Sequence, residues 1–218
     1  MGILISFLSV GPAMVLHGLI QATSNGYRAW LNRKDINWSI IFTLLIGCGV
    51  SLIILFFIAF EPSQILVIFA LGLLPYIAWA VPKQLALDIT KPSIGILAGI
   101  VVVGTNLTAG VGGPLLDIFF QRVDMTRHQV VATKAVAQTL GHIAKIVFFG
   151  GLLISFSFEN WPNPLFLFFA IILSIFGTTL GKKVLDIIDD EIFFRWTQII
   201  VLSVASIFIV RGLFLLTQ

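Results

Sequence analysis

The sequence predicts an all-α membrane protein with several transmembrane helices, and three observations support this fold class. Hydrophobic residues make up 58% of the 218 residues and charged residues only 11%, whereas a typical soluble domain is about 25% charged. The apolar residues stand in long uncharged runs, many of them near the roughly 20 residues that a spanning helix needs. These runs lack the alternating pattern of a transmembrane β-barrel. We therefore expect the solvent of this chain to be the lipid bilayer.

The candidate spans are the long apolar runs, which cover most of the chain. They lie at residues 1–27, 37–60, 62–82, 92–116, 129–158, 160–181 and 196–210. Gly11-Pro12 punctuates the first run, and Pro75 is expected to kink the third. The segment GVGGP, residues 110–114, breaks the fourth run near its end.

The connections between the runs differ in charge, and this difference predicts the orientation of the chain. Cytoplasmic loops of membrane proteins carry an excess of lysine and arginine. The basic connections contain Arg28, Arg33, Lys34, Lys83, Lys91, Arg122, Arg127, Lys182 and Lys183. The connections at Glu61 and at Glu159-Asn160 carry acid and no base. We therefore expect the basic connections in the cytoplasm, and the acidic connections and the C-terminus outside.

This orientation puts Lys91 and Arg122 on one side of the membrane with a single apolar run between them. The conflict disappears if the chain enters the bilayer, breaks at 110–114 and returns as a re-entrant pair of half-helices. The same interpretation applies to Gly11-Pro12, whereas two full spans in place of the hairpins would break the charge rule. Each half of the chain is then a hairpin plus about three spans.

An odd number of spans gives two halves of opposite orientation, so we expect two inverted-topology repeats at 1–90 and 91–218. GPAMVLHGLIQATSN (11–25) and GPLLDIFFQRVDMTRHQVVATKA (113–135) support the repeat, because each contains Gly-Pro, an apolar stretch and then Ala-Thr. Paired segments interrupted by Gly and Pro, at corresponding positions in two halves, point to a transporter's binding site.

The run that begins at residue 129 carries a polar stripe. At 100° per residue, its members fall on one helix face; they are Lys134, Gln138, Gly141, His142 and Lys145. A lone lysine at the centre of a spanning helix costs about 2.5–3.5 kcal/mol on insertion scales. One interpretation is that Lys134 extends to the cytoplasmic surface and Lys145 pairs with an acid elsewhere. The other is that the stripe lines a cavity that binds an anion.

The first half carries a matching face. Gln21, Asn25 and Arg28 stand at i, i+4 and i+7, and Thr23 and Ser24 add hydroxyl groups beside them. An anion site is one interpretation of this face. The other is that Arg28 marks the cytoplasmic end of the helix and Asn25 caps it.

The broken segment TNLTAGVGGP, residues 105–114, offers a third group of polar atoms. Non-helical backbone inside a membrane is tolerated where it lines a cavity, and a half-helix N-terminus presents free N–H groups to anions. Glycines also allow close helix packing, which is the alternative. On the first interpretation, Thr105, Asn106, Gly112 and Gly113 join the candidate site.

Several function classes find no support. The sequence has no P-loop, no zinc-protease motif and no nucleophile elbow. The scattered histidines and the single Cys48 predict no metal or other cofactor, and the dispersed basic residues predict no nucleic-acid partner. Asp117 is the only carboxylate near the candidate site, and we expect it at the interface or paired with Arg122, Arg127 or Lys145.

The two polar blocks resemble those of the sulfite exporter TauE/SafE family of membrane permeases. The resemblance is carried by QATSNGYRAWLNRKDINW (21–38) after a Gly-Pro segment, by GVGGPLLDIFF (110–120) and by ATKAVAQTLGHIAKIVFFG (132–150). It extends over nearly the whole chain, but only these blocks are specific.

The resemblance implies an all-helical fold with two related halves that moves small anions such as sulfite and sulfonates. The positions that it links to the substrate path are Thr23, Ser24, Asn25, Gly112, Gly113, Pro114, Thr133, Lys134 and His142. Family members commonly carry more helix and a Gly-rich run before the first Gly-Pro, so we expect either that the first repeat is truncated at its N-terminus or that the true start of the chain lies upstream.

We therefore expect a multi-pass permease of the cell inner membrane that binds a small anion near the midplane. We expect no enzymatic activity, and the sequence allows either a monomer or a homo-oligomer. A negative cell interior drives anions out by about 2.3 kcal/mol per charge per 100 mV, so export needs no coupling ion. The main alternative is an accessory subunit of a larger transport complex, which has no need of the polar stripe. An intramembrane enzyme would need a nucleophile–base pair, which the sequence does not show.

Overall fold

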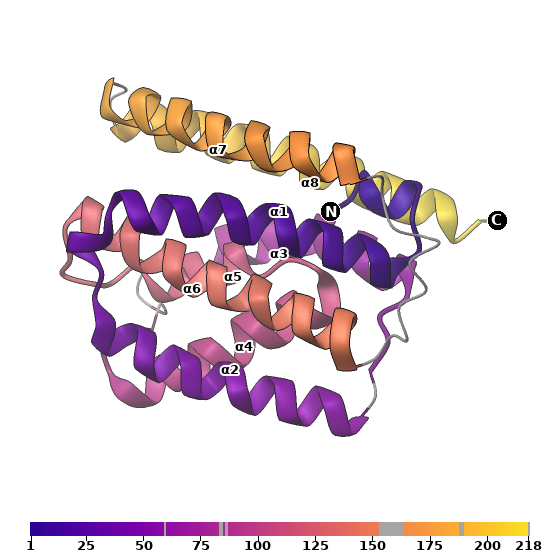
Figure 1. The fold of residues 1–218 in the computed structure, drawn as a ribbon, viewed down its shortest axis with the longest axis horizontal. Helices are drawn as coiled ribbons and strands as arrows, with labels where there is room; N and C mark the ends of the chain where they lie inside the picture. The colour runs from indigo at the N-terminus through magenta and orange to yellow at the C-terminus, as the bar shows by residue number, and fades with distance from the viewer. Residues whose placement is uncertain (59, 83–84, 86, 153–163, 188–189, 218) are drawn as a thin grey trace.

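A computed structural model describes residues 1–58, 60–82, 85, 87–152, 164–187 and 190–217 (Figure 1). Every regular element in these ranges is a helix, which confirms the all-α prediction. The elements are η1 (Leu4–Ser6), α1 (Val10–Leu31), η2 (Arg33–Asp35), α2 (Trp38–Ile58), α3 (Gln64–Ala80), α4 (Pro92–Ala109), α5 (Gly113–Phe119), α6 (Arg127–Val147), the π-helical turn η4 (Phe148–Leu152), α7 (Pro164–Ile187) and α8 (Asp190–Leu215). The predicted topology signals Lys83 and Glu159-Asn160 lie outside the described residues.

Four helices among the described residues are long and apolar enough to cross a membrane, which supports a membrane protein. They are α2, α4, Pro164–Lys183 of α7 and Arg195–Leu215 of α8. Large apolar side chains are exposed along α7 and α8, as expected for helices that face lipid rather than water.

Local sequence signals account for several helix ends. Thr126 and Gln129 form a capping box at the start of α6, in which each side chain bonds the other residue's backbone N–H. Asn32 closes α1, and its side chain donates to the Arg28 carbonyl. Asn25 lies inside α1, more than a turn before its end, so the expectation that Asn25 caps this helix is wrong.

Helices α2 and α4 pack along a seam of small residues and run in the same direction. A Cβ added to Gly47 would lie 2.1 Å from the Ile96 carbonyl oxygen, and one added to Gly99 would lie 2.3 Å from that of Leu44. Further along the seam, Ser51 Oγ donates to the Ile100 carbonyl at 2.7 Å. Glycines are required here because no side chain fits between the two backbones.

Helices α4 and α6 also run in the same direction. Asn106 Nδ2 donates to the Gly141 carbonyl, and Lys145 Nζ donates to the Gly110 carbonyl; each contact joins residues 35 positions apart and measures 2.9 Å. Between them the chain must therefore return to the end where α4 began. It reverses at Gly110, and α5 packs back against α4.

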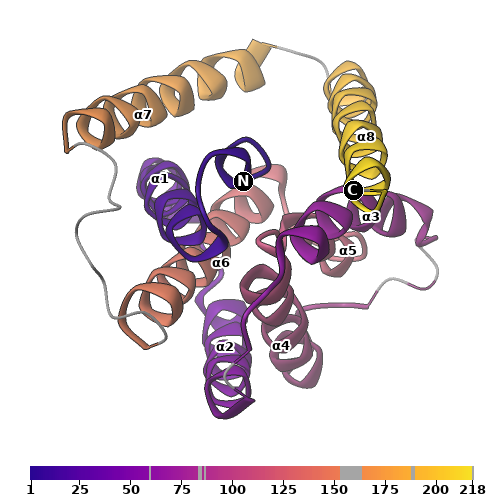
Figure 2. The same ribbon diagram turned by 90° about the vertical axis from the view of Figure 1, so that its right-hand side faces the viewer.

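The remaining helices pack in antiparallel and parallel pairs around this centre (Figure 2). Helix α1 runs opposite to α6, with His17 beside His142 at one end and the Asn37 N–H, just after α1, donating to Thr133 Oγ1 at the other. Helix α7 follows α1 in the same direction, joined by hydrogen bonds from Ser24 to Thr178 and from Ser174 to the Ile20 carbonyl.

The last pair consists of α3 and α8, which run in opposite directions. The Tyr76 hydroxyl lies 2.6 Å from Ser206 Oγ, and a Cβ on Gly72 would lie 2.6 Å from Ile209 Cγ1.

These directions separate the connections by charge. One end of the bundle holds most of the basic residues: Arg33, Lys34, Lys91, Arg122, Arg127, Lys182 and Lys183. Lys182 and Lys183 were expected in a connection, and the structure places them in the last turns of α7. The opposite end holds Glu61 and the end of α8 at Leu215 (Figure 1). We call these the basic end and the acidic end. The separation is the one that the positive-inside rule requires of a membrane protein.

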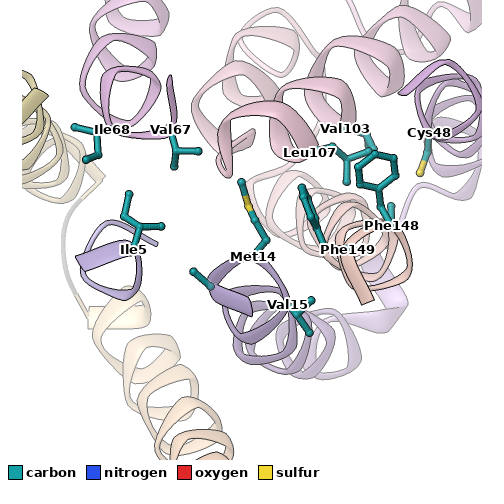
Figure 3. Packing of buried hydrophobic residues seen from close by; sticks show 12 residues of the cluster. Ile5, Met14, Val15, Cys48, Val67, Ile68, Val103, Leu107, Phe148 and Phe149 are labelled. Atoms are coloured by element: carbon teal, nitrogen blue, oxygen red, sulfur yellow. The ribbon is translucent and has the colours of Figure 1, made fainter. Parts of the chain in front are cut away.

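Two apolar clusters hold the helices together. The larger one lies toward the acidic end and surrounds Met14, Leu107, Phe148 and Phe149 (Figure 3). Met14 projects from α1 toward α4 and η4 in this view. The second cluster packs α5 against α2 and α4, with Leu116 and Phe119 among its buried residues. Together the clusters fix α4, α5 and α6 against one another.

Candidate functional site

The centre of the candidate site is a completely buried lysine. Lys145, in the last turn of α6, has no solvent-exposed surface. Its ammonium group donates to the Gly110 carbonyl at 2.9 Å and lies 3.4 Å from His17 Nδ1. No carboxylate of the described residues lies within ion-pairing distance of it. Buried charges in proteins are ordinarily paired, so a lone buried ammonium is an unusual feature.

A second polar group, His142, stands one turn before Lys145 on the same face of α6. It is 8% exposed, and its Nδ1 atom has no hydrogen-bond partner in the described part of the chain. The His142 ring meets the His17 ring edge to face, with 5.4 Å between ring centroids. An imidazole nitrogen can donate or accept, depending on its tautomer.

A third polar group, Asn106 of α4, is 4% exposed and faces the same seam. Its Nδ2 atom donates to the Gly141 carbonyl at 2.9 Å, while Oδ1 has no partner among the described residues. A carbonyl oxygen can only accept, so this bond determines which end of the amide is the NH₂ group. The orphan atom is therefore an acceptor.

The break between α4 and α5 presents the Gly110 carbonyl to Lys145. Gly110 has φ of 76°, the left-handed conformation that favours glycine, and it ends α4. A Cβ on Gly112 would lie 2.4 Å from the Val102 carbonyl, so a side chain there would prevent the chain from folding back. The predicted break at 110–114 is confirmed. Glycine is required at 110 by the left-handed backbone and at 112 by the close approach of the Val102 carbonyl.

Lys134, at the other end of the predicted stripe, lies in a different environment. It forms an ion pair with Asp117 of α5, and the two side chains are 26% and 55% exposed. We expected Asp117 at the interface or paired with Lys145, Arg122 or Arg127, and the structure shows an ion pair with Lys134, which was not among the expected partners. The alternative that Lys145 pairs with an acid finds no such acid among the described residues.

Four predicted hydroxyl residues use their side chains within the fold. Thr23 and Thr105 donate to carbonyls one turn back in their own helices, Leu19 and Val101. Ser24 bonds Thr178 of α7, and Thr133 accepts from the backbone at the start of α2. The bonds of Ser24 and Thr133 join neighbouring helices, and all four bonds leave the hydroxyls with less capacity to bind a ligand.

The other predicted residues of the first half, Gln21, Asn25 and Arg28, lie in different environments. Asn25 is buried, and its side chain makes no hydrogen bond to a described residue. Arg28 is half-buried in the last turn of α1, where a cation favours the helix dipole. Gln21 is half-buried in the middle of α1. The structure therefore does not gather this face into one cluster with Lys145.

Gln138 and Gly113 come together between the two lysines. A Cβ on Gly113 would lie 3.2 Å from Gln138 Nε2, so this amide covers the start of α5. Helix α5 has only seven residues, and its dipole is correspondingly weak.

Sequence reasoning missed His17, which was treated as one of several scattered histidines. Its signal is visible only across helices, because α1 and α6 are far apart in sequence and antiparallel in space. In the described residues, no three His, Cys, Asp or Glu side chains lie close enough together to hold a metal ion. Comparison with protein-family models, with curated proteins and with solved structures finds no match to the chain.

Proposed function

We propose that this chain is a multi-pass permease of the cell inner membrane for a small oxyanion such as sulfite or a sulfonate. In this proposal the anion binds between α1, α4 and α6, at the group formed by His17, Asn106, His142 and Lys145. We call this group the Lys145 cluster. The chain has no catalytic role in the proposal, and its transported ligand is its only small-molecule partner.

The observation that carries the proposal is the Lys145 ammonium, buried without a carboxylate among the described residues. Transferring an unpaired charge out of water is unfavourable by several kcal/mol even after relaxation. A chain tolerates this arrangement when a counter-ion of opposite charge comes from outside. An anionic substrate is such a counter-ion, and the two imidazoles beside Lys145 can orient its oxygens.

The proposal includes an inverted repeat in which α1, α2 and α3 correspond to α6, α7 and α8. Two features support it. The corresponding helices α1 and α6 pack antiparallel, as do α3 and α8, which is the relation that a two-fold axis in the membrane plane produces. The cross-pairs also match, because α1 packs on α7 and α2 packs on α6.

The re-entrant hairpin is part of the same proposal. Helices α4 and α6 run in one direction from the basic end, and the short α5 lies between them in the chain. The counterpart in the first half is η1, which precedes α1 as α5 precedes α6. With the basic end in the cytoplasm, Lys145 lies toward the outer face and Lys134 toward the inner face.

The test is anion flux through the purified protein in liposomes. Wild type is compared with Lys145→Gln and with Lys134→Gln, a matched control that removes the same charge from the same helix. We expect wild type to carry sulfite, and Lys145→Gln to lose at least about 100-fold, since a charge-assisted bond in a buried site is worth roughly 1.5–3 kcal/mol or more. Lys134→Gln should lose less, because Asp117 already pairs with that lysine.

Two outcomes would contradict the proposal. Equal flux in wild type and folded Lys145→Gln would mean that Lys145 does not bind the anion. No flux in wild type for any small oxyanion, with the protein correctly inserted, would favour the accessory subunit.

A further inference from the structure

The polar atoms of the Lys145 cluster indicate the chemistry of its ligand. Lys145 Nζ is a cation that already donates to the Gly110 carbonyl. Two further atoms have no hydrogen-bond partner among the described residues: the imidazole nitrogen His142 Nδ1 and the acceptor Asn106 Oδ1. A fully deprotonated oxyanion carries acceptors only, so it satisfies the cation and leaves Asn106 Oδ1 without a donor. A buried acceptor left without a donor is penalised by its full desolvation.

The position of Asn106 Oδ1 places it within reach of the same ligand. Asn106 and Gly110 stand one turn apart on α4 and face Gly141 and Lys145, one turn apart on α6. The amide therefore lies about one helical pitch, ~5.4 Å, along the seam from the Lys145 ammonium. A small oxyanion whose oxygens sit roughly 2.8 Å from each protein atom can bridge that separation.

We propose that the Lys145 cluster selects an oxyanion that retains one acidic proton, with its charged oxygens toward Lys145 and His142 and its O–H donating to Asn106 Oδ1. Hydrogen sulfite and hydrogen carbonate belong to this class; sulfate, nitrate and sulfonates do not. The inference rests on the proposed function and narrows it, because it selects hydrogen sulfite over sulfonates.

The test uses pairs of anions that match in shape and charge and differ in the proton. Hydrogen carbonate and nitrate are both planar with three oxygens, and hydrogen sulfite and chlorate are both pyramidal with three oxygens. Dissociation constants are measured by titration calorimetry on the full chain in detergent, at a pH below the second ionisation of sulfurous acid. We expect the protonated member of each pair to bind about tenfold tighter or more.

Asn106→Ala should bring the ratio of the two dissociation constants within each anion pair close to one, and it should change the affinity for chlorate little. The matched control is Ser51→Ala, which removes another interhelical bond to a backbone carbonyl, at a site outside the Lys145 cluster. It should leave the ratio unchanged. The comparison of anions on wild type needs no variant, so the inference remains testable if Asn106→Ala does not fold.

The outcomes separate the two proposals. Equal affinity within both anion pairs, or tighter binding of methanesulfonate than of hydrogen sulfite, would overturn the inference and leave anion transport standing. Absence of binding and of liposome flux for every anion would overturn the proposed function itself. If the Asn106→Ala variant still binds the protonated anions more tightly, another atom accepts the hydrogen bond from the ligand's O–H group. That result would overturn the assignment to Asn106.

Discussion

Lys134 and Lys145 lie on one face of the same helix, about three turns apart, and the fold treats them in opposite ways. Lys134 is partly exposed and paired with Asp117. Lys145 is fully buried and meets a carbonyl and an imidazole. The charge near the basic end is paired, whereas the charge near the acidic end has no carboxylate partner among the described residues. A single polar stripe in sequence is therefore two different sites in space.

The largest expected effect concerns which face of the membrane each of the two lysines lies toward, and a topology reporter gives an all-or-none answer. A reporter that is active only in the cytoplasm should be inactive when fused after Gln218, because α8 ends at the acidic end. The same reporter inserted after Lys34 should be active, since that connection lies at the basic end. Activity after Gln218 would exchange the two faces and place Lys145 toward the cytoplasm.

The next largest effect concerns stability. Lys145→Met should raise the free energy of unfolding in detergent micelles, even though it removes the hydrogen bond to Gly110. Relief from burying the charge is worth several kcal/mol, against about 1–3 kcal/mol for the carbonyl left unpaired. Lys134→Met should instead lower it, by less than about 1 kcal/mol. A fall of more than about 1 kcal/mol in Lys145→Met would identify Lys145 as a structural residue.

The third prediction concerns the backbone turn at Gly110, whose carbonyl accepts the hydrogen bond from Lys145. Gly110→Ala should lower the free energy of unfolding by about 1–2 kcal/mol, because a left-handed φ of 76° is strained for alanine. Met14 Cε, 3.2 Å from the added Cβ, would also have to move. Gly49→Ala is the matched control. Nothing lies within 4 Å of its added Cβ in helix α2, so this change should stabilise by roughly 0.5–1 kcal/mol. Equal effects of the two substitutions would show that the turn carries no strain.

The smallest expected effect is the coupling between Lys134 and Asp117. A double-mutant cycle with Lys134→Gln and Asp117→Asn, followed by thermal unfolding, should give a coupling below about 1 kcal/mol because both side chains are partly exposed. A coupling of several kcal/mol would mean that the pair is shielded from solvent and closer in character to the Lys145 cluster.

Much of the fold could be predicted from apolar run length and charge. The run at 37–60 became α2 (Trp38–Ile58), and the run at 62–82 became α3 (Gln64–Ala80). The break at 110–114 followed from the need to place Lys91 and Arg122 at the same end, and the structure has α4 end there. These features depend on local composition, so sequence alone carries them.

The site could be predicted only in part. The stripe on α6 contained Lys145 and His142, and the broken segment contained Asn106, but their partners lie on other helices. His17 joins them because α1 packs antiparallel to α6. Thr23, Thr105 and Thr133 were candidates by residue type, and their hydroxyls proved to be bonded within the fold.

The sequence by itself determined that this chain is helical, apolar enough for a membrane, and charged unequally in its connections, because each property is a sum over neighbouring residues. Only the tertiary structure decided which lysine is paired and which is alone. That outcome depends on whether a carboxylate from a distant helix comes within a few ångströms, and helix periodicity describes only the helix on which a residue stands. The reversal of the chain at Gly110 brings Asp117 back beside Lys134, so that Lys134 is paired. Lys145 receives only the carbonyl oxygen of Gly110 and the neighbouring His17 ring.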